Sequence, residues 1–267
     1  MSKIKERENT LLELLQTYRK LSIQYISDYF AISEATARRL CSKLEQEKQV
    51  VRTHGGVQIL DLGISDYSFQ NKENTNLPQK VAIGNYCSSL INSNERIYCD
   101  SGTTIKQLII SLTNRLRNNE LSDVTVLSNS LSNYDPIANY CKVILLGGEV
   151  RINRLDLCGP LTEDNIRKFG ITKAFLGVDA INMKRGYMTT DERTARINEI
   201  ILAEAETTYV LTDSSKFDKS SFISYAELGD ITETITDWEL DDALRMELEA
   251  AGVKIFQINP PKRVLKP

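Results

Sequence analysis

A short basic amphipathic segment followed by a glycine turn, residues 33–56, most constrains what this chain can fold into. Ser33 is a good N-cap, because its hydroxyl can accept a hydrogen bond from a free backbone N–H of the first helical turn. At 3.6 residues per turn, Ala37, Cys41 and Leu44 share one face of the helix that follows. The segment therefore predicts a helix that docks by its apolar face and leaves a basic face free.

Two apolar stripes precede this helix, so three short helices fit before residue 50. The stripes consist of Leu11, Leu14, Leu15 and Tyr18, and of Ile23, Ile26, Ser27 and Phe30. This is the size of a helix-turn-helix module, in which the second helix of the pair enters the major groove and presents its N-terminal residues to base edges. We therefore expect this helix to contact double-stranded DNA through Ser33, Thr36, Arg38, Arg39 and Lys43.

The residues after the helix predict a two-stranded wing. Residues 50–51 and 57–60 are typical of strands, and glycine in the turn between them permits a positive φ. Arg52 and His54 on such a wing are expected to reach phosphates or a minor groove, although His54 is equally typical of a turn residue that contacts nothing. Adjacent arginines on a helix commonly mark only a solvated face; the wing favours the nucleic-acid interpretation.

Charge and length indicate a basic head on a larger acidic body. Residues 1–60 hold ten Lys or Arg against seven Asp or Glu, whereas the remainder holds 23 against 29. This excess is modest, so dimerisation would be needed to multiply phosphate contacts. We expect a DNA-binding domain over residues 1–60, a connection over 61–79, and a second domain with its own core over 80–267.

Several classes of protein are not expected from this composition. No apolar run is long enough to span a membrane and the N-terminus is charged, which predicts a cytoplasmic protein without a membrane partner. The five cysteines form no CxxC pair, and the chain has one histidine, so we expect reduced core thiols and no metal site. The cysteines are Cys41, Cys87, Cys99, Cys141 and Cys158.

Beyond residue 80 the chain alternates short apolar runs with helical patterns. Strands are predicted at residues 96–100, 124–127, 142–146, 173–177, 208–212, 234–236 and 253–258, with helices such as 81–91 and 105–112 between them. This alternation predicts an α/β fold, with a parallel sheet covered by helices on both faces. In such sheets, ligands bind beyond the carboxyl ends of the strands.

Small and polar residues follow the first five predicted strands, which makes these strand ends a candidate anion site. Glycine followed by hydroxyls at a helix N-terminus offers backbone N–H groups to a phosphate. A lysine can add a point charge, and aspartates can accept hydrogen bonds from sugar hydroxyls. The expected site comprises Asp100, Gly102, Thr103, Thr104, Ser128, Asn129, Ser130, Gly147, Gly148, Asp179 and Lys216. The alternative is ordinary turn chemistry at each strand end.

Over essentially its whole length, the chain resembles the DeoR-type transcriptional repressors. The motifs that carry this resemblance are SEATARRL and LEQEKQVVRTHGG in the head, and DSGTT, LSNS, LGG, AFLG and DSSKF in the body. The resemblance implies a winged helix-turn-helix joined to a ribose-phosphate-isomerase-like α/β sensor. It also implies that a phosphorylated sugar releases the protein from operator DNA. Because a two-fold operator needs at least a dimer to read it, we expect a homo-oligomer, a dimer or tetramer, and we expect no cofactor.

The chain departs from the family pattern at several positions. The usual Arg-Arg-Asp-Leu of the recognition helix is Arg-Arg-Leu-Cys at residues 38–41, so the operator is expected to differ from those of relatives. Ala180 and Asn198 replace a common Gly and a common Lys near the expected effector, which adds Asn198 to the effector site. The sensor motifs resemble repressors of amino-sugar operons more than those of simple hexose operons.

An isomerase of sugar phosphates is the alternative, because the expected sensor fold resembles such enzymes. Isomerisation needs a general base within hydrogen-bonding reach of the substrate. On the isomerase pattern, the catalytic glutamate falls on Asn198, which cannot serve as a base. The neighbouring Glu199 would point about 100° away on a helix. We therefore expect ligand binding without turnover and no catalytic residue.

Overall fold

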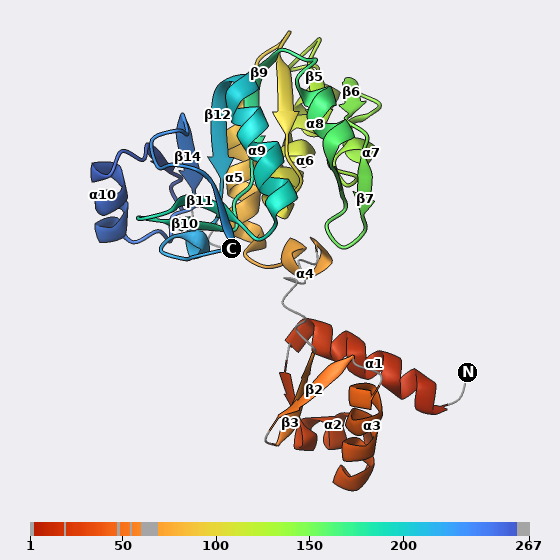
Figure 1. The fold of residues 1–267 in the computed structure, drawn as a ribbon. Coiled ribbons are helices and arrows are strands. Elements are labelled where there is room, and N and C mark those ends of the chain that lie inside the picture. Colours follow the sequence, from red (N-terminus) through yellow and green to blue (C-terminus); the bar gives the residue numbers. More distant parts are fainter. Residues whose placement is uncertain (1–2, 19, 47–48, 54, 60–68, 261–267) are drawn as a thin grey trace, which may run out of the picture. The chain divides into compact units, whose positions relative to one another are not determined.

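The computed structural model describes residues 3–18, 20–46, 49–53, 55–59 and 69–260 (Figure 1). The chain divides into two compact units, Met1–Asp66 and Tyr67–Pro267. In the described residues, no helix is both long enough and apolar enough to cross a membrane.

The N-terminal unit is a winged helix-turn-helix, as predicted. Its elements are α1 (Lys3–Tyr18), β1 (Lys20–Ser22), α2 (Ile23–Phe30), α3 (Glu34–Gln46), β2 (Val50–Thr53) and β3 (Gly56–Ile59). The strands β2 and β3 form the wing, and β1 pairs antiparallel with β3 to give the order β1-β3-β2. Strand β1 was not predicted, because three residues between two helices carry too short a pattern.

The predicted apolar faces build the core of this unit. Leu11 and Leu15 of α1, Ile26 of α2, and Ala37 and Cys41 of α3 are fully buried in one cluster. Helices α2 and α3 begin at hydroxyl caps, since the Ser22 hydroxyl accepts from the backbone N–H of Tyr25 at 3.0 Å and the Ser33 hydroxyl accepts from that of Thr36 at 3.3 Å. These caps and the buried stripe fix α3 so that its other face is turned to solvent.

The C-terminal unit is a seven-stranded parallel sheet with helices on both faces. The sheet strands are β4 (Arg96–Cys99), β5 (Thr125–Ser128), β6 (Lys142–Leu145), β9 (Ile171–Leu176), β12 (Ala205–Leu211), β14 (Glu233–Thr236) and β15 (Ile255–Gln257). Each corresponds to one of the seven predicted runs, and their order is β15-β14-β12-β9-β4-β5-β6. The remaining strands are β7 (Glu149–Arg151), β8 (Asp156–Cys158), β10 (Ala180–Asn182), β11 (Gly186–Thr189) and β13 (Ile223–Ala226).

Helices cover both faces of the sheet (Figure 1), and the buried apolar side chains form two clusters, whose members on each sheet strand alternate between the two faces. On one face, Ile200 and Ile201 pack in the same buried cluster as Leu176 of β9. On the other face, Ile105 and Phe175 belong to a second cluster. The helices are α4 (Phe69–Glu73), α5 (Leu77–Ser89), α6 (Thr103–Arg117), α7 (Tyr134–Ile137), α8 (Pro160–Ile166), α9 (Glu192–Glu204) and α10 (Asp242–Ala250), with a 3₁₀ turn η1 (Ser214–Lys216).

The strand order reverses between β4 and β9, which are adjacent in the sheet although seven elements separate them in the chain. The chain runs outward from β4 through β5 to β6, and outward on the other side from β9 to β15. A crevice forms at such a point because the two connecting loops leave in opposite directions. The loops after Cys99 and Leu176 therefore frame the natural ligand site of this sheet.

The segment expected to be a connection contributes two helices to the sensor instead. Residues 60–68 lie outside the described part, but α4 begins at Phe69 and α5 at Leu77. Phe69 is buried, and its backbone N–H donates to the Asn153 carbonyl at 3.0 Å. The polar composition of residues 61–79 suggested a connection, but Phe69 is buried in the second unit and Pro78 stands in the first turn of α5, where its fixed φ suits a helix.

Candidate functional site

The candidate DNA surface is the solvent face of α3. Arg38 and Arg39 are exposed, and Arg38 forms an ion pair with Glu34 one turn earlier at 3.2 Å. The Ser33 hydroxyl caps the helix by accepting from the Thr36 backbone N–H at 3.3 Å, and it also bonds the Thr36 hydroxyl at 2.9 Å. An exposed i,i+4 pair is weak, so phosphates or base edges can compete with Glu34 for Arg38.

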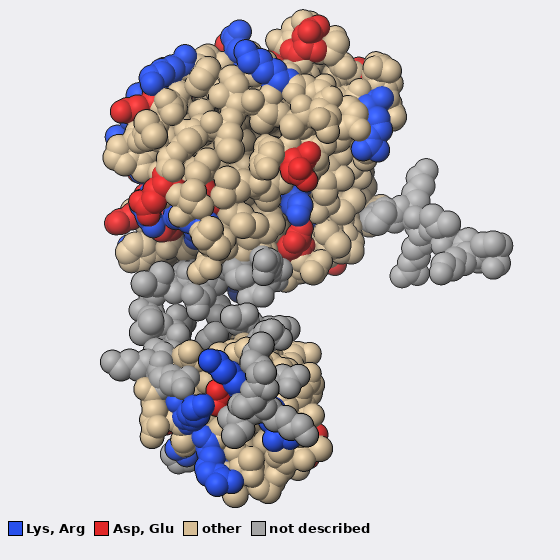
Figure 2. Space-filling model, turned by 90° about the vertical axis from the view of Figure 1, so that its right-hand side faces the viewer, with Lys and Arg blue, Asp and Glu red and all other residues tan. Residues whose placement is uncertain are grey.

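The other two predicted cations of this unit also have partners inside it. The Lys43 ammonium lies 2.6 Å from a carboxylate oxygen of Glu8, a residue that is itself buried. The Arg52 guanidinium donates to the Ser42 hydroxyl at 3.1 Å and lies 3.9 Å from Glu45. His54 lies outside the described residues. On the face drawn in Figure 2, Lys and Arg cover more of the N-terminal unit than Asp and Glu do.

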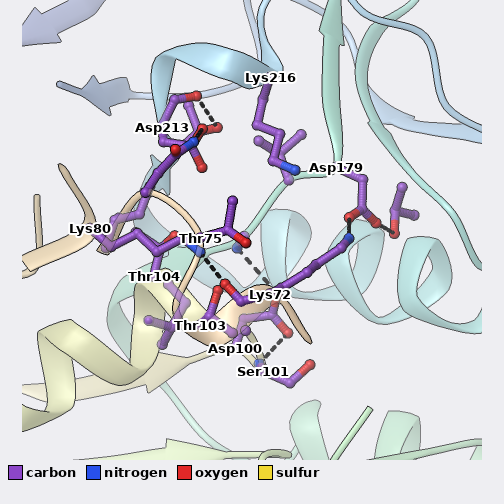
Figure 3. A pocket seen from close by; sticks show the side chains of 18 of the residues that line it. Lys72, Thr75, Lys80, Asp100, Ser101, Thr103, Thr104, Asp179, Asp213 and Lys216 are labelled. Atoms are coloured by element: carbon purple, nitrogen blue, oxygen red, sulfur yellow. Dashed lines mark hydrogen bonds and ion pairs between the residues drawn. The ribbon is translucent and has the colours of Figure 1, made fainter. Parts of the chain in front are cut away.

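The candidate effector site is a pocket at the carboxyl ends of β4, β9 and β12 (Figure 3). Its lining comprises Lys72, Thr75, Asn76, Lys80, Asp100, Ser101, Gly102, Thr103, Thr104, Ile105, Arg154, Gly177, Val178, Asp179, Thr189, Thr194, Leu211, Thr212, Asp213, Ser215 and Lys216. The pocket thus occupies the point of strand reversal. Six predicted residues meet there: Asp100, Gly102, Thr103, Thr104, Asp179 and Lys216.

The predicted residues after β5 do not line this pocket, because their polar groups are used inside the fold. The Ser128 hydroxyl donates to the Cys99 carbonyl at 2.6 Å. Asn129 accepts from the Tyr98 hydroxyl at 3.0 Å and donates to the Leu157 carbonyl at 3.1 Å. The fully buried Ser130 bonds the hydroxyl of Ser132 at 2.9 Å. These side chains join β4, β5 and β8 behind the pocket.

The predicted glycines after β6 also lie away from the pocket and serve a turn. Gly147 and Gly148 have φ values of 56° and 133°, which favour glycine. A Cβ atom on Gly148 would lie 2.1 Å from the Thr162 hydroxyl oxygen. This strand end therefore matches the turn-chemistry alternative.

Asn198 is buried in α9 and does not line the pocket. Both polar atoms of its side-chain amide lack a hydrogen-bond partner among the described residues. Thr194, one turn earlier, does line the pocket. Glu199 is exposed and pairs with Arg196 at 3.1 Å. Among the described residues, no carboxylate of α9 lines the pocket.

Much of the pocket's charge comes from residues that the sequence did not single out as site residues. Lys72 and Asn76 belong to the stretch expected to be a connection, and Lys80 opens the second domain. Arg154 follows β7, a strand that was not predicted. Only Asp213, within the DSSKF motif, carried a sequence signal. The others occur in polar segments whose composition is the same whether they line a pocket or face water.

Asp100 is held at the base of the pocket by two backbone N–H groups. Its carboxylate accepts from Ser101 at 2.7 Å and from Gly177 at 3.2 Å, so it ties the loops after β4 and β9 together. Burial raises the pKa of Asp100 from 3.8 to about 7, and the nearby Asp156 carboxylate adds to the rise. The two N–H donors and Arg154 oppose it without cancelling it.

This raised pKa predicts that the sensor unit loses stability as pH rises. The folded chain keeps the Asp100 proton up to about pH 7, whereas the unfolded chain loses it near pH 3.8. The contribution of Asp100 to the free energy of unfolding is therefore fully present below pH 3.8 and is lost as the pH rises through 7. Between about pH 5.5 and about pH 7.5 the loss is expected to be about 2 kcal/mol. The Asp100→Asn variant, which has no ionisable group at this position, should not show this loss of stability. Melting temperatures at both pH values measure this, and equal pH slopes for the two proteins would contradict it.

The remaining charges form a cluster in which lysines face aspartates. Burial lowers the pKa of Lys80 to about 8, with Asp213 opposing the shift and Lys216 and Lys72 adding to it. Burial also opposes ionisation of Asp179, but Lys72, its hydrogen bond and Arg154 outweigh this and hold the pKa at about 2. The Lys216 ammonium points into the pocket without an ion pair or hydrogen bond to any described residue (Figure 3). Such a cation can receive an anionic ligand without first giving up a partner.

The lysines, aspartates and hydroxyls that line the pocket are groups that can bind an anionic, hydroxylated ligand. Among the described residues, no group of three or more His, Cys, Asp or Glu side chains is placed to hold one. The five thiols are free, and all except the half-buried Cys141 are buried. The N-terminus of α6, from Gly102 onward, opens into the pocket and adds backbone donors.

Comparison with known proteins covers both units. A family model described as the DeoR C terminal sensor domain matches residues 75–238, and one described as a DeoR-like helix-turn-helix domain matches residues 7–62. The transcriptional regulator GlpR of Haloferax volcanii is 30% identical over 260 residues, spanning 94% of this chain and 96% of its own. The uncharacterized HTH-type regulator YulB of Bacillus subtilis is 28% identical, spanning 97% and 99%.

Among solved structures, a D-ribose-5-phosphate isomerase in complex with phospho-erythronic acid is 19% identical with a TM-score of 0.40, covering 52% of this chain and 53% of its own.

Proposed function

This chain belongs to the DeoR family of transcriptional regulators, and we propose that it represses a sugar-utilisation operon and leaves operator DNA when a phosphorylated sugar binds its sensor. It would act in the cytoplasm, where its operator is found. The winged helix reads the DNA, and the pocket at the strand reversal reads the sugar.

The exposed face of α3 supports the DNA-reading role. Arg38 and Arg39 present two guanidinium groups on the helix that enters the major groove in this fold. Arginine can bond guanine O6 and N7 at once, which distinguishes a G·C pair from the others. The departure at Leu40 and Cys41, both of which are buried, leaves base reading to the neighbouring positions.

The unpartnered ammonium of Lys216 is the observation that carries the effector assignment. It projects into a pocket that also holds Lys72 and Lys80 and that receives the N-terminus of α6. A phosphate dianion satisfies all four groups, because the lysines supply charge and the helix supplies backbone N–H donors. The carboxylates of Asp179 and Asp213 can accept from sugar hydroxyls on the same ligand.

The protein is proposed to act as a homo-oligomer, with a dimer as the minimum. A single winged helix makes few phosphate contacts, whereas two-fold operators present two half-sites to a dimer. Two DNA-binding units acting together also supply operator affinity that the small net positive charge of one unit does not supply. Tetramers are consistent with the same argument.

Binding without turnover is proposed in preference to isomerase activity. Asn198 replaces the expected base and lies outside the pocket, and Glu199 faces solvent. Asp100 has a pKa near neutrality, but both of its oxygens accept backbone N–H groups that hold the pocket loops. Interconversion of ribose 5-phosphate and ribulose 5-phosphate by the pure protein would support the enzyme instead.

Fluorescence anisotropy of labelled DNA from upstream of this protein's own gene tests the proposal. The protein is expected to bind this fragment in preference to a scrambled one of equal length. A panel of sugar phosphates, which includes hexosamine 6-phosphates because the sensor motifs resemble those of amino-sugar repressors, is then added, and one member is expected to restore free-DNA anisotropy. Sequence-dependent binding that no compound disturbs would contradict the sensor assignment, and absent binding would contradict the DNA assignment.

A further inference from the structure

Residues 69–76, here called the strap, form one wall of the pocket and are anchored outside it. Phe69 is buried, and the Lys106 ammonium lies 5.6 Å from its ring centroid. Glu73 forms an ion pair with the same lysine at 2.5 Å, which joins the strap to α6. The strap is the first described part of the sensor after residues 60–68, which connect it in sequence to the DNA-binding unit.

One ion pair ties the strap to the far side of the pocket. The Lys72 ammonium lies 2.9 Å from one Asp179 carboxylate oxygen (Figure 3). The other oxygen accepts from the Thr189 hydroxyl at 3.1 Å and from the Thr190 backbone N–H at 3.1 Å and hydroxyl at 3.0 Å. Asp179 is therefore fixed by the β11 end, and Lys72 is the partner that crosses the pocket to reach it.

Two further bonds make the strap sensitive to what the pocket holds. The buried Lys80 ammonium donates to the Lys72 backbone carbonyl at 2.6 Å. The Asn76 amide donates to Asp213 at 2.9 Å. Each of these bonds joins a strap atom to a group that the proposed ligand would also engage, so ligand binding and strap position share the same side chains.

We propose that Lys72 and Asp179 form a latch that holds the strap in the DNA-binding conformation, and that a phosphorylated sugar opens it. This inference rests on the proposed function and adds the residue that couples the pocket to the DNA-binding unit. A phosphate competes for Lys72 and a sugar hydroxyl competes for Asp179, so either contact is made at the expense of the pair.

The sign of the effect follows from linkage. A ligand that replaces the latch binds more tightly to the conformation in which the latch is open, and it shifts the population toward that conformation. Under the proposed function, the ligand-favoured conformation is the one that leaves DNA. Removing the latch by mutation should therefore weaken operator binding without any ligand present, whereas loss of a simple ligand contact would not.

Full-length Lys72→Met tests the latch, because methionine keeps the length of the side chain and removes its charge. Lys72→Arg keeps the charge and serves as the rescue. Lys173→Met is the matched control, since Lys173 pairs with Glu95 at 2.6 Å in the same unit but lines no part of the pocket. Operator affinity is measured with the anisotropy assay, and hydrogen exchange of the strap amides is measured by mass spectrometry, both without ligand.

Lys72→Met is expected to weaken operator binding about 10-fold or more, in the range of typical coupling between sites, and to speed exchange over residues 69–76. Lys173→Met should keep wild-type values in both measurements, and Lys72→Arg, which keeps the charge, should recover most of the operator affinity that Lys72→Met loses. Unchanged operator affinity in Lys72→Met would overturn the latch, whether or not its response to a sugar phosphate is lost.

The failure of the latch and the failure of the proposed function can be told apart. If wild-type protein binds the operator but no sugar phosphate releases it, the sensor assignment fails, and the variants still report on the latch. If wild-type protein does not bind the operator, the proposed function fails and only hydrogen exchange tests the latch. Unchanged exchange over residues 69–76 in Lys72→Met would then overturn the latch.

Discussion

Arg38→Ala is expected to remove specific operator binding while the sensor continues to respond to its ligand. A base-edge contact contributes about 1–3 kcal/mol. A dimer loses the contact twice, so operator affinity should fall about 100-fold or more. The variant should keep its fold, because Arg38 is exposed and its ion pair with Glu34 is on the surface. Anisotropy with the operator fragment measures the loss, and ligand-induced thermal stabilisation measures what remains.

Arg167→Ala provides the matched control for this variant. Arg167 is also a half-exposed arginine whose partner is a nearby acid, Asp164 at 3.6 Å, but it lies on the sensor. Its removal changes the net charge by the same amount and should leave operator affinity unchanged. Equal losses in the two variants would mean that overall charge, and not base reading by α3, sets the affinity.

Lys216→Ala is expected to keep operator binding and lose release. A charge-assisted hydrogen bond to a phosphate contributes about 1.5–3 kcal/mol, so the concentration of sugar phosphate needed for half-release should rise about 10- to 100-fold. The fold should tolerate the change, because the Lys216 ammonium bonds no described group that would be left buried and unpaired. Titration of the protein–operator complex with the releasing compound measures the shift.

Lys219→Ala is the control, since Lys219 is an exposed lysine three residues further along that does not line the pocket. It should release like the wild type. If Lys216→Ala also releases at wild-type concentrations, the ammonium does not hold the ligand, and the phosphate must be placed elsewhere in the pocket. If Lys216→Ala fails to bind the operator, the substitution has impaired folding, and a lower melting temperature than that of the wild type will show this.

Local patterns were enough to predict the elements that build both units. The stripe of Ala37, Cys41 and Leu44 predicted the docking face of α3, and the Ser33 cap predicted its start. The seven apolar runs predicted the parallel strands, because a strand buried on both faces needs continuous apolar residues. Strand β1, the pair β7-β8 and the small sheet β10-β11-β13 were missed, because strands of three or four residues carry too short an apolar pattern to recognise.

The sequence predicted the edge of the sheet at which the pocket lies, but it predicted only some of the residues that line the pocket. Strand ends after β4, β9 and β12 converge because strand order reverses between β4 and β9, and that order depends on pairing between residues far apart in the sequence. The same sheet order puts the ends of β5 and β6 off to one side. Ser128 and Asn129 therefore bond the core, although their motif looks the same as those that reach the pocket.

The amino-acid sequence by itself determined the two-unit organisation, the helix α3 with its exposed basic face and the edge of the sheet at which the pocket lies, because hydrophobic periodicity, caps and strand-end turns are local properties. Only the tertiary structure decided which polar side chains meet. Lys72 reaches Asp179 across 107 positions of sequence, and Asp100 acquires its raised pKa from burial by distant segments. Contacts of this kind depend on how the chain packs in space, which no local pattern encodes.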